Sequence, residues 1–158
     1  MRKKLTQRER NKRRPKADDR FHSGTVAKFT NYLMWEGKKE TARAILYGAL
    51  HDAEKKLKDE PVRILEGAIR NVSPEMEVRS KRVGGANYQV PREVPAPRRL
   101  MLACRWIIES ARSGKGSPMQ RRLADELVAA YKNEGEAVKK KDAMHKMAEA
   151  NRAFAHLA

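Results

Sequence analysis

Apolar residues recur every three or four positions through most of the chain, and this spacing places them on one face of an α-helix. Glycine and proline interrupt the pattern at intervals, for example at Gly37, Pro61 and Gly114. Helices are therefore predicted over about 25–37, 39–58, 61–71, 97–113, 117–134 and 138–156. We expect a mainly all-α fold, a bundle of about six helices joined by short connections.

The predicted core is formed by the side chains that share these apolar faces. Cys104 is among them, so we expect a buried thiol and neither a nucleophile nor a disulfide. Trp35, at the end of the first helix, is expected to pack as an anchor, with a stacking platform as the alternative. The predicted inward residues are Val26, Phe29, Leu33, Met34, Ala42, Ile45, Leu46, Ala49, Ala53, Leu57, Ile64, Leu65, Ala68, Ile69, Leu100, Met101, Cys104, Ile107, Ile108, Ala111, Leu123, Leu127 and Ala130.

The stretch VRSKRVGGANYQVPREV, residues 78–94, departs from the helical pattern. Two extended segments flank Gly84-Gly85, a pair that favours a two-residue hairpin turn. Such a turn pairs Val83 with Ala86, and it leaves cationic or amide groups on both faces of the ribbon. We expect a protruding two-stranded β-hairpin over about 75–93, between the third and fourth helices and held by them at its base.

The charge of the chain points to a polyanionic partner. The 36 Lys and Arg residues outnumber the 20 Asp and Glu residues, so the formal net charge is +16 at pH 7 and the pI is about 10.3. This balance is unusual for an enzyme that acts on small molecules, and it is ordinary for a protein that binds nucleic acid.

Many of the cations lie in an N-terminal tail, residues 1–22, which has almost no apolar side chain before Phe21. Such a segment cannot offset the entropy lost on ordering, so we expect it to be disordered until a partner neutralises it. A single helical domain is expected to cover residues 23–158. The cations of the tail are Arg2, Lys3, Lys4, Arg8, Arg10, Lys12, Arg13, Arg14, Lys16 and Arg20.

A second group of cations lies on the predicted hairpin and at the start of the next helix. Only Glu77 and Glu93 oppose them there, and Tyr88 offers a ring that could stack on a base or lie under Lys81. We therefore predict that the hairpin binds phosphates, with a merely solvated surface hairpin as the alternative. The cations of this group are Arg79, Lys81, Arg82, Arg92, Arg98, Arg99 and Arg105.

The sequence contains no pattern that predicts a catalytic, metal or cofactor site. Gly114-Lys115-Gly116 lacks the strand and the earlier glycine of a phosphate-binding loop, so we interpret it as a helix-breaking turn. The histidines do not converge in the sequence. There is no apolar run for a secretory signal or a membrane span, and acids in the first 22 residues argue against a mitochondrial transit peptide.

Five long blocks of residues, within about 23–156, can be compared with known families. They are VAKFTNYLMWEGKKETA (26–42), NVSPEMEVRSKRVGGANYQVPREV (71–94), RWIIESAR (105–112), LADEL (123–127) and NEGEAVKKKDAMHKMAEANRAFAH (133–156). In this order they resemble the bacterial type of the small-subunit ribosomal protein seven family. The tail follows the family pattern least, and the chain ends at Ala158 without the longer aromatic extension of some members.

The resemblance implies a non-enzymatic structural constituent of the small ribosomal subunit. Members bind the 3′ major domain of the small-subunit rRNA directly and early, and they organise assembly of the subunit head. The resemblance also implies a monomer within cytoplasmic ribosomes rather than organellar ones. Its implied neighbours are the ninth and eleventh small-subunit proteins, with exit-site tRNA close to the hairpin and the last helix.

Two sets of residues are expected to make these contacts. The residues predicted to bind rRNA are Arg2, Lys3, Lys4, Arg8, Arg10, Lys12, Arg13, Arg14, Lys16, Lys28, Arg79, Lys81, Arg82, Arg92, Arg98, Arg99, Lys115 and Arg122. The residues predicted to lie near the tRNA are Arg82, Val83, Gly84, Gly85, Ala86, Lys139, Lys140, Lys141, Lys146 and Arg152.

The residues themselves leave two other functions open. A basic architectural DNA-binding protein can also carry a β-arm, but it needs a dimer interface and apolar wedges at the tip, where only Val83 is available. An RNA-modifying enzyme needs a nucleophile, a metal or a cofactor loop, and the sequence shows a pattern for none of them. Binding of structured rRNA in preference to duplex DNA separates the first of these from the ribosomal function.

Overall fold

The computed structural model describes residues 16–157, which form α-helices, one antiparallel sheet and a C-terminal 3-10 helix. The α-helices are α2 (Gly24–Leu33), α3 (Lys39–Leu57), α4 (Pro61–Val72), α5 (Ala96–Ser113), α6 (Met119–Tyr131) and α7 (Glu136–Ala150). The strands are β1 (Met76–Val83) and β2 (Ala86–Glu93), and the 3-10 helix is η1 (Arg152–Leu157). The predicted helical fold, with a hairpin between the third and fourth helices of the described residues, is confirmed.

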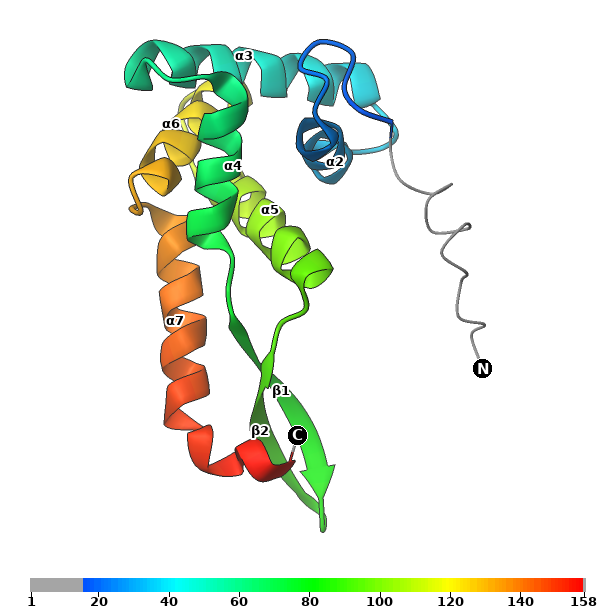
Figure 1. The fold of residues 1–158 in the computed structure, drawn as a ribbon, viewed down its shortest axis with the longest axis vertical. Coiled ribbons are helices and arrows are strands. Elements are labelled where there is room, and N and C mark those ends of the chain that lie inside the picture. The colour runs from blue at the N-terminus through cyan, green and yellow to red at the C-terminus, as the bar shows by residue number, and fades with distance from the viewer. Residues whose placement is uncertain (1–15, 158) are drawn as a thin grey trace.

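The helices α2 to α6 form a body, and the hairpin of β1 and β2 forms an arm that leaves it. Figure 1 shows α3 lying across one end of the body, with the arm and α7 both extending from the other end. The chain then turns through η1, so that its C-terminal end returns to the arm. Contacts of α7 with β1 and of η1 with β2 support the arm, and its tip extends beyond them. No helix within residues 16–157 is both long and apolar enough to span a membrane.

One apolar core fills the body, and each of its helices contributes to it. Phe29, Leu46, Leu65, Ile107 and Leu123 are among its largest fully buried side chains. Every residue that the periodicity placed inward is buried or half-buried, so the predicted helix faces are confirmed. Removal of this apolar surface from water is the main favourable contribution to folding.

The first helix ends earlier than predicted. α2 stops at Leu33 because Met34 takes an extended conformation, with ψ 138°, and because Glu36 and Gly37 turn the chain with φ values of 52° and 72°. A positive φ is uncommon for a residue such as Glu36. Trp35 therefore lies in the connection to α3, where it is 70% exposed, and the prediction that it packs as an anchor was wrong.

The last helix is also shorter than predicted. α7 ends at Ala150, and the side chain of Asn151 donates a hydrogen bond to the carbonyl of Met147 at 2.8 Å. The residues of η1 follow at once, and their tighter winding redirects the end of the chain. This change of direction brings the C-terminal segment against the arm.

Residues 18–22, which the sequence assigned to the tail, form a turn against the body. The buried Asp18 carboxylate accepts hydrogen bonds from the backbone N–H groups of Arg20 and Phe21, both at 3.1 Å, and from the Tyr47 hydroxyl at 2.7 Å. The Phe21 ring packs edge-on against Tyr47, with ring centroids 5.4 Å apart. One aromatic contact and one fully paired carboxylate thus hold a segment whose composition alone predicts no order.

Burial by itself raises the pKa of Asp18, but the Tyr47 hydroxyl and the two backbone donors outweigh it and lower that pKa. The charged carboxylate therefore stabilises the fold above the ordinary Asp pKa of about 3.9, and this contribution fades as the pH falls through the lower folded-state value. Asp18→Asn is expected to reduce the free energy of unfolding by about 1–2 kcal/mol near neutral pH.

Chemical denaturation at pH 7 and pH 3 measures this effect, and the difference between wild type and Asp18→Asn should shrink at the lower pH. Asp19→Asn is the matched control, because the Asp19 side chain is 90% exposed. An equal loss for Asp18→Asn at both pH values would contradict the role of the charge.

Cys104 supplies a second test of the fold. It is fully buried on α5, and burial raises the pKa of its thiol to about 12. Only the thiolate reacts with disulfide reagents, so labelling of the native protein should be slow and limited by unfolding. Rapid labelling without denaturant would show that this face of α5 is open to solvent.

Candidate nucleic-acid interface

The arm has the register that the sequence predicted. Val83 pairs with Ala86 across a turn in which Gly84 and Gly85 have φ values of 58° and 88°. Positive φ at both central residues is typical of the hairpin turn whose twist matches antiparallel strands. Residues 79–87 are all exposed, so the outer half of the arm presents its cations to solvent.

The base of the arm belongs to the folded body. Val90 and the nearby Val94 are only 1% exposed. The backbone N–H of Glu75, just before β1, donates to Nε2 of His145 on α7 at 3.0 Å. The hairpin is thus held at its base, but mainly by α7, which contacts both strands, and not by both of the helices that flank it in sequence as predicted; of these, α5 reaches β1 through the side chain of Arg98.

A buried carboxylate organises the cations at this base. Glu77 on β1 is 5% exposed, and its two oxygens accept hydrogen bonds from different arginines. Oε1 accepts from Nε of Arg79, and Oε2 accepts from Nε of Arg98 on α5, both at 2.7 Å. Arg99 donates through Nε to the carbonyl of Val94, also at 2.7 Å. The first turn of α5 and the first strand are thus tied together through charged groups.

These bonds orient the two arginines and leave some of their N–H donors unpaired. The side chains of Arg79 and Arg98 remain 48% and 38% exposed. A guanidinium carries five N–H donors, so donors remain that can reach a phosphate. Arg82 and Arg92 are exposed and form no side-chain hydrogen bond or ion pair with residues 16–157.

The segment η1 supports the side of the arm. The ring of Phe154 packs against Tyr88 on β2, with centroids 5.2 Å apart and planes inclined by 54°. Lys81 donates a hydrogen bond from Nζ to the carbonyl of Leu157. Tyr88, whose ring the sequence offered to a base or to Lys81, therefore contacts an aromatic residue of the protein itself.

The lysines at 139–141 also contact acceptors within the protein. The acceptors are the carboxylates of Glu136 and Glu109 and the carbonyl of Asn71, at 2.7, 3.1 and 2.8 Å respectively. These contacts offset the unfavourable position of cations near the start of a helix. Further along the chain, Lys146 and Arg152 are exposed.

The predicted phosphate contacts of the body lie on other elements. Lys28 is half-buried on α2, and Lys115 is exposed in the turn between α5 and α6. Arg122 closes that turn, because its Nη1 donates to the carbonyls of Arg112, at 3.1 Å, and of Gly114. The Gly114-Lys115-Gly116 stretch is thus a helix-breaking turn, as predicted.

Sequence reasoning missed two residues of this surface. It counted Glu77 only as a charge opposing the arginines, and it gave Arg112 no role. Arg112 donates through Nη2 to the carbonyl of Leu33 at 3.0 Å and lies over the Trp35 ring, 5.1 Å from its centroid. Arg98 lies 21 residues from Glu77, and Leu33 lies 79 residues from Arg112, so no local signal predicts these two contacts.

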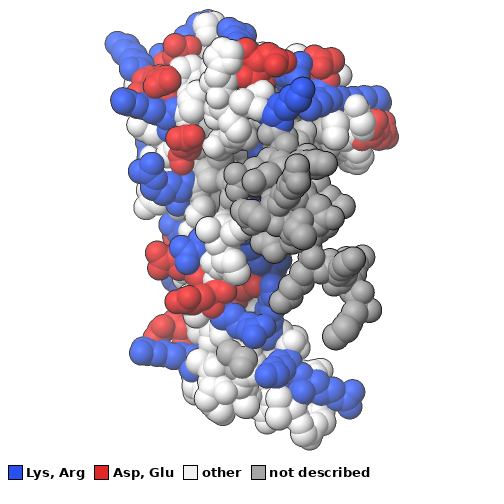
Figure 2. Space-filling view, turned by 45° about the vertical axis from the view of Figure 1, so that its right-hand side comes forward, with Lys and Arg blue, Asp and Glu red and all other residues white. Residues whose placement is uncertain are grey.

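Basic side chains lie along most of the length of the face in Figure 2, with acidic side chains between them. The predicted tail contacts, except Lys16, fall outside the described residues, and Lys16 is exposed. These contacts are Arg2, Lys3, Lys4, Arg8, Arg10, Lys12, Arg13 and Arg14. Among the residues that the structure describes, the surface is suited to a long polyanion, because its cations extend from the body to the arm.

Known proteins are similar in sequence to this chain over most of its length. The family model described as ribosomal protein S7p/S5e matches residues 4–152. A protein of Thermotoga petrophila is 56% identical over 131 residues, which are 83% of this chain and 84% of that protein. A protein of Thermotoga maritima is 51% identical over 152 residues, covering 96% and 98% of the two chains. A protein of Anaeromyxobacter sp. is 52% identical over 149 residues, covering 94% and 96%. All three are named small ribosomal subunit protein uS7.

The buried carboxylate of Glu77 is expected to be a structural centre of the arm. Glu77→Gln keeps the size of the side chain but removes the charge that two arginines share. Hydrogen bonds to a charged group contribute about 1.5–3 kcal/mol, so the free energy of unfolding should fall by about 1–3 kcal/mol. Chemical denaturation measures this loss, and amide hydrogen exchange should become faster along β1.

Glu93→Gln is the matched control, because Glu93 is exposed at the same end of the arm, opposite Met76. It should leave both the stability and the exchange rates near those of wild type. If the two variants behave alike, the pairing of Glu77 does not fix the arm.

Proposed function

The chain belongs to the ribosomal protein S7p/S5e family, and from this premise we propose that it binds the 3′ major domain of the small-subunit rRNA directly. It is a structural, non-enzymatic protein of the small ribosomal subunit, in agreement with relatives named small ribosomal subunit protein uS7. In the proposal it binds early and organises the assembly of the subunit head. The observation that carries the proposal is an arm with a fixed base and an exposed cationic outer half.

The fixed base lowers the entropic cost of binding. Arg79 and Arg98 are already oriented by Glu77, so fewer side-chain conformations are lost when a phosphate arrives. The tip of the arm is narrow because Gly84 and Gly85 carry no side chains. A thin basic ribbon of this kind suits the backbone and shape of folded RNA, which exposes few base edges in its duplexes.

The remaining rRNA contacts in the proposal come from the body and the tail. Lys28 lies on α2, whereas Lys115 and Arg122 lie together at the turn between α5 and α6, so the body can contact the RNA at two places. The tail cations add an electrostatic contribution, since neutralisation of phosphates by cations releases counterions. Neutralisation of several converging strands stabilises an RNA junction and so favours the next assembly steps.

The arm tip and the C-terminal helices are proposed to lie near exit-site tRNA. The arm and η1 occupy the same end of the molecule in Figure 1, which supports a shared partner at that end. The neighbours proposed there and on the body are the ninth and eleventh small-subunit proteins. The protein acts as a monomer within cytoplasmic ribosomes in this proposal.

The free arginines of the arm give the sharpest test of RNA binding. Arg79 and Lys81 have partners within the protein, so the test uses Arg82→Gln together with Arg92→Gln. The fold should be unaffected, because exposed substitutions usually change stability by less than about 0.5 kcal/mol each. Affinity for a 3′ major domain fragment should fall, and the slope of log affinity against log salt should shrink by about one to two from a wild-type magnitude of about five or more.

The measurement is a binding titration at several salt concentrations, with circular dichroism on the same preparations. Lys55→Gln with Arg63→Gln is the matched control, because both residues are exposed, lie outside the proposed RNA contacts and carry the same total charge. Duplex DNA is the competitor that distinguishes an architectural DNA-binding protein. Equal affinities and slopes for the two double variants would exclude the arm from RNA binding.

A further inference from the structure

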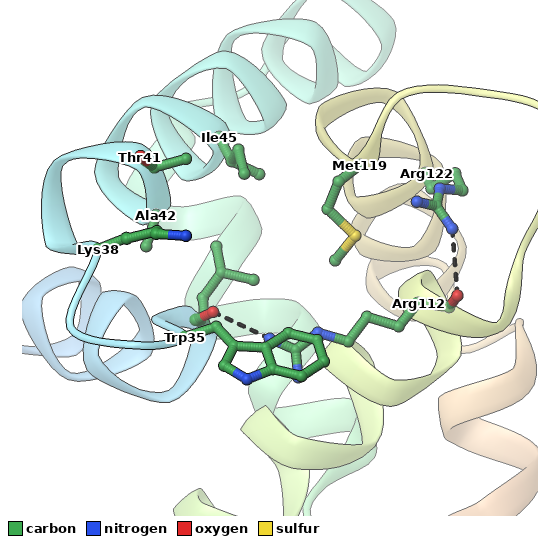
Figure 3. A pocket seen from close by; sticks show the side chains of 9 residues that line it. Trp35, Lys38, Thr41, Ala42, Ile45, Arg112, Met119 and Arg122 are labelled. Atoms are coloured by element: carbon green, nitrogen blue, oxygen red, sulfur yellow. Dashed lines mark hydrogen bonds between the residues drawn. The ribbon is translucent and has the colours of Figure 1, made fainter.

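A groove beside Trp35 lies at the surface of the body, away from the arm. It has a volume of about 530 Å³, and it is bounded by the α2–α3 connection, α3, the end of α5 and the start of α6. In Figure 3, Ile45 of α3 and Met119 of α6 face the same open space, with the Trp35 indole at its edge. We call this feature the Trp35 groove.

Trp35 is the most exposed large hydrophobic side chain among residues 16–157. It is 70% exposed, compared with 49% for Met147 and 39% for Val83. One exposed apolar side chain is ordinary, but Trp35 adjoins Leu33, Ala42, Ile45 and Met119 in the lining of the groove, and a contiguous apolar surface is typical of an interaction site. The position of Trp35 also follows from backbone constraints, since Glu36 and Gly37 both adopt positive φ directly after it.

The indole has an oriented neighbour. The Arg112 guanidinium lies 5.1 Å from the centre of the ring, and its Nη2 is bonded to the Leu33 carbonyl at 3.0 Å. A cation over one face of an indole is attracted to the π electrons, which helps to hold the ring. Trp35 thus forms a prepared aromatic platform, and less conformational entropy is lost when a ligand stacks on it.

The charges around the groove indicate that its ligand carries negative charge. Its lining contains Lys38, Arg112 and Arg122 and includes no carboxylate. Lys38 forms an ion pair with Glu36 at 2.8 Å, but both side chains are about two-thirds exposed, so solvent screens that pair. The groove therefore combines an apolar floor, a stacking surface and a cationic rim.

An unpaired nucleotide is complementary to the apolar floor, to the stacking surface and to the cationic rim. Its base can stack on an aromatic side chain and cover apolar surface, while its phosphate meets the cations. An apolar peptide would cover the floor but leave the cationic rim without a partner. Duplex backbone would neutralise the rim but leave the indole in water.

We propose that the Trp35 groove binds one unpaired nucleotide of the RNA, with the base stacked on Trp35 and the phosphate held by Arg112 and Lys38. This inference rests on the proposed function, because it assumes that rRNA is the partner. It adds a second kind of recognition, since the arm contacts backbone whereas the groove selects a position where a base is unstacked.

The test uses the intrinsic fluorescence of Trp35. The chain has two tryptophans, and Trp106 is half-buried, so Trp106→Phe leaves Trp35 as the only indole. Titration with a 3′ major domain fragment should quench the Trp35 emission and saturate at one RNA per protein. If Trp106→Phe does not fold, the difference in emission between wild type and Trp35→Phe supplies the same signal.

Affinity gives an independent readout. Trp35→Ala should weaken rRNA binding by about tenfold, which lies within the range measured for loss of a base–aromatic stack. The salt slope should stay unchanged, because stacking releases no counterions. Trp35→Phe should retain most of the affinity, since a phenyl ring can also stack.

The matched control is Arg82→Gln with Arg92→Gln, which should reduce both the affinity and the salt slope while the Trp35 emission still responds. If rRNA binds but Trp35→Ala has wild-type affinity and the emission does not change, the groove inference is wrong and the proposed function stands. If rRNA does not bind at all, both are wrong. An emission change caused by other small-subunit proteins, or by raised protein concentration, but not by RNA would assign the groove to a protein partner or a second copy and overturn the inference.

Discussion

A buried carboxylate between two arginines sets the direction of the arm. Glu77 is withdrawn from water at the junction of β1 and α5, and an unpaired charge at such a place would be strongly destabilising. Arg79 and Arg98 donate hydrogen bonds to its two oxygens. If β1 and α5 separated, the carboxylate would lose Arg98 and would be either exposed to water or left buried with one donor fewer. The side-chain link between the arm and α5 and the orientation of Arg79 and Arg98 depend on this pairing.

Other cationic side chains also have acceptors within the protein, but these acceptors are backbone carbonyls. Backbone carbonyls accept hydrogen bonds from Arg99, Arg112, Arg122 and Lys141, each at a place where the chain turns or a helix ends. These bonds satisfy carbonyls that would otherwise lack a donor, and they fix the direction of each cationic side chain. Basic residues therefore fall into two groups, those that organise the fold and those, such as Arg82, that remain free for a partner.

Local rules in the sequence predicted much of this fold. Helical periodicity located the inward faces, and the Gly84-Gly85 pair determined the register of the whole arm, because a two-residue turn leaves no freedom in strand pairing. The burial of Glu77 could not be predicted in this way, since Arg98 lies 21 residues away and is brought to it only by the tertiary fold. The exposure of Trp35 was missed because the end of α2 depends on the backbone of Met34 and Glu36 rather than on hydrophobic pattern.

The return of η1 to the arm has a consequence for the order in which the protein is completed during its own synthesis. Lys81 and Leu157 are 76 residues apart in sequence, and Phe154 meets Tyr88 across a similar distance. A nascent chain emerges from its N-terminus, so the body and both strands are available before their last support exists. Because the residues of η1 are synthesised after both strands, we expect the side of the arm around Tyr88 to reach its final packing later than the body does.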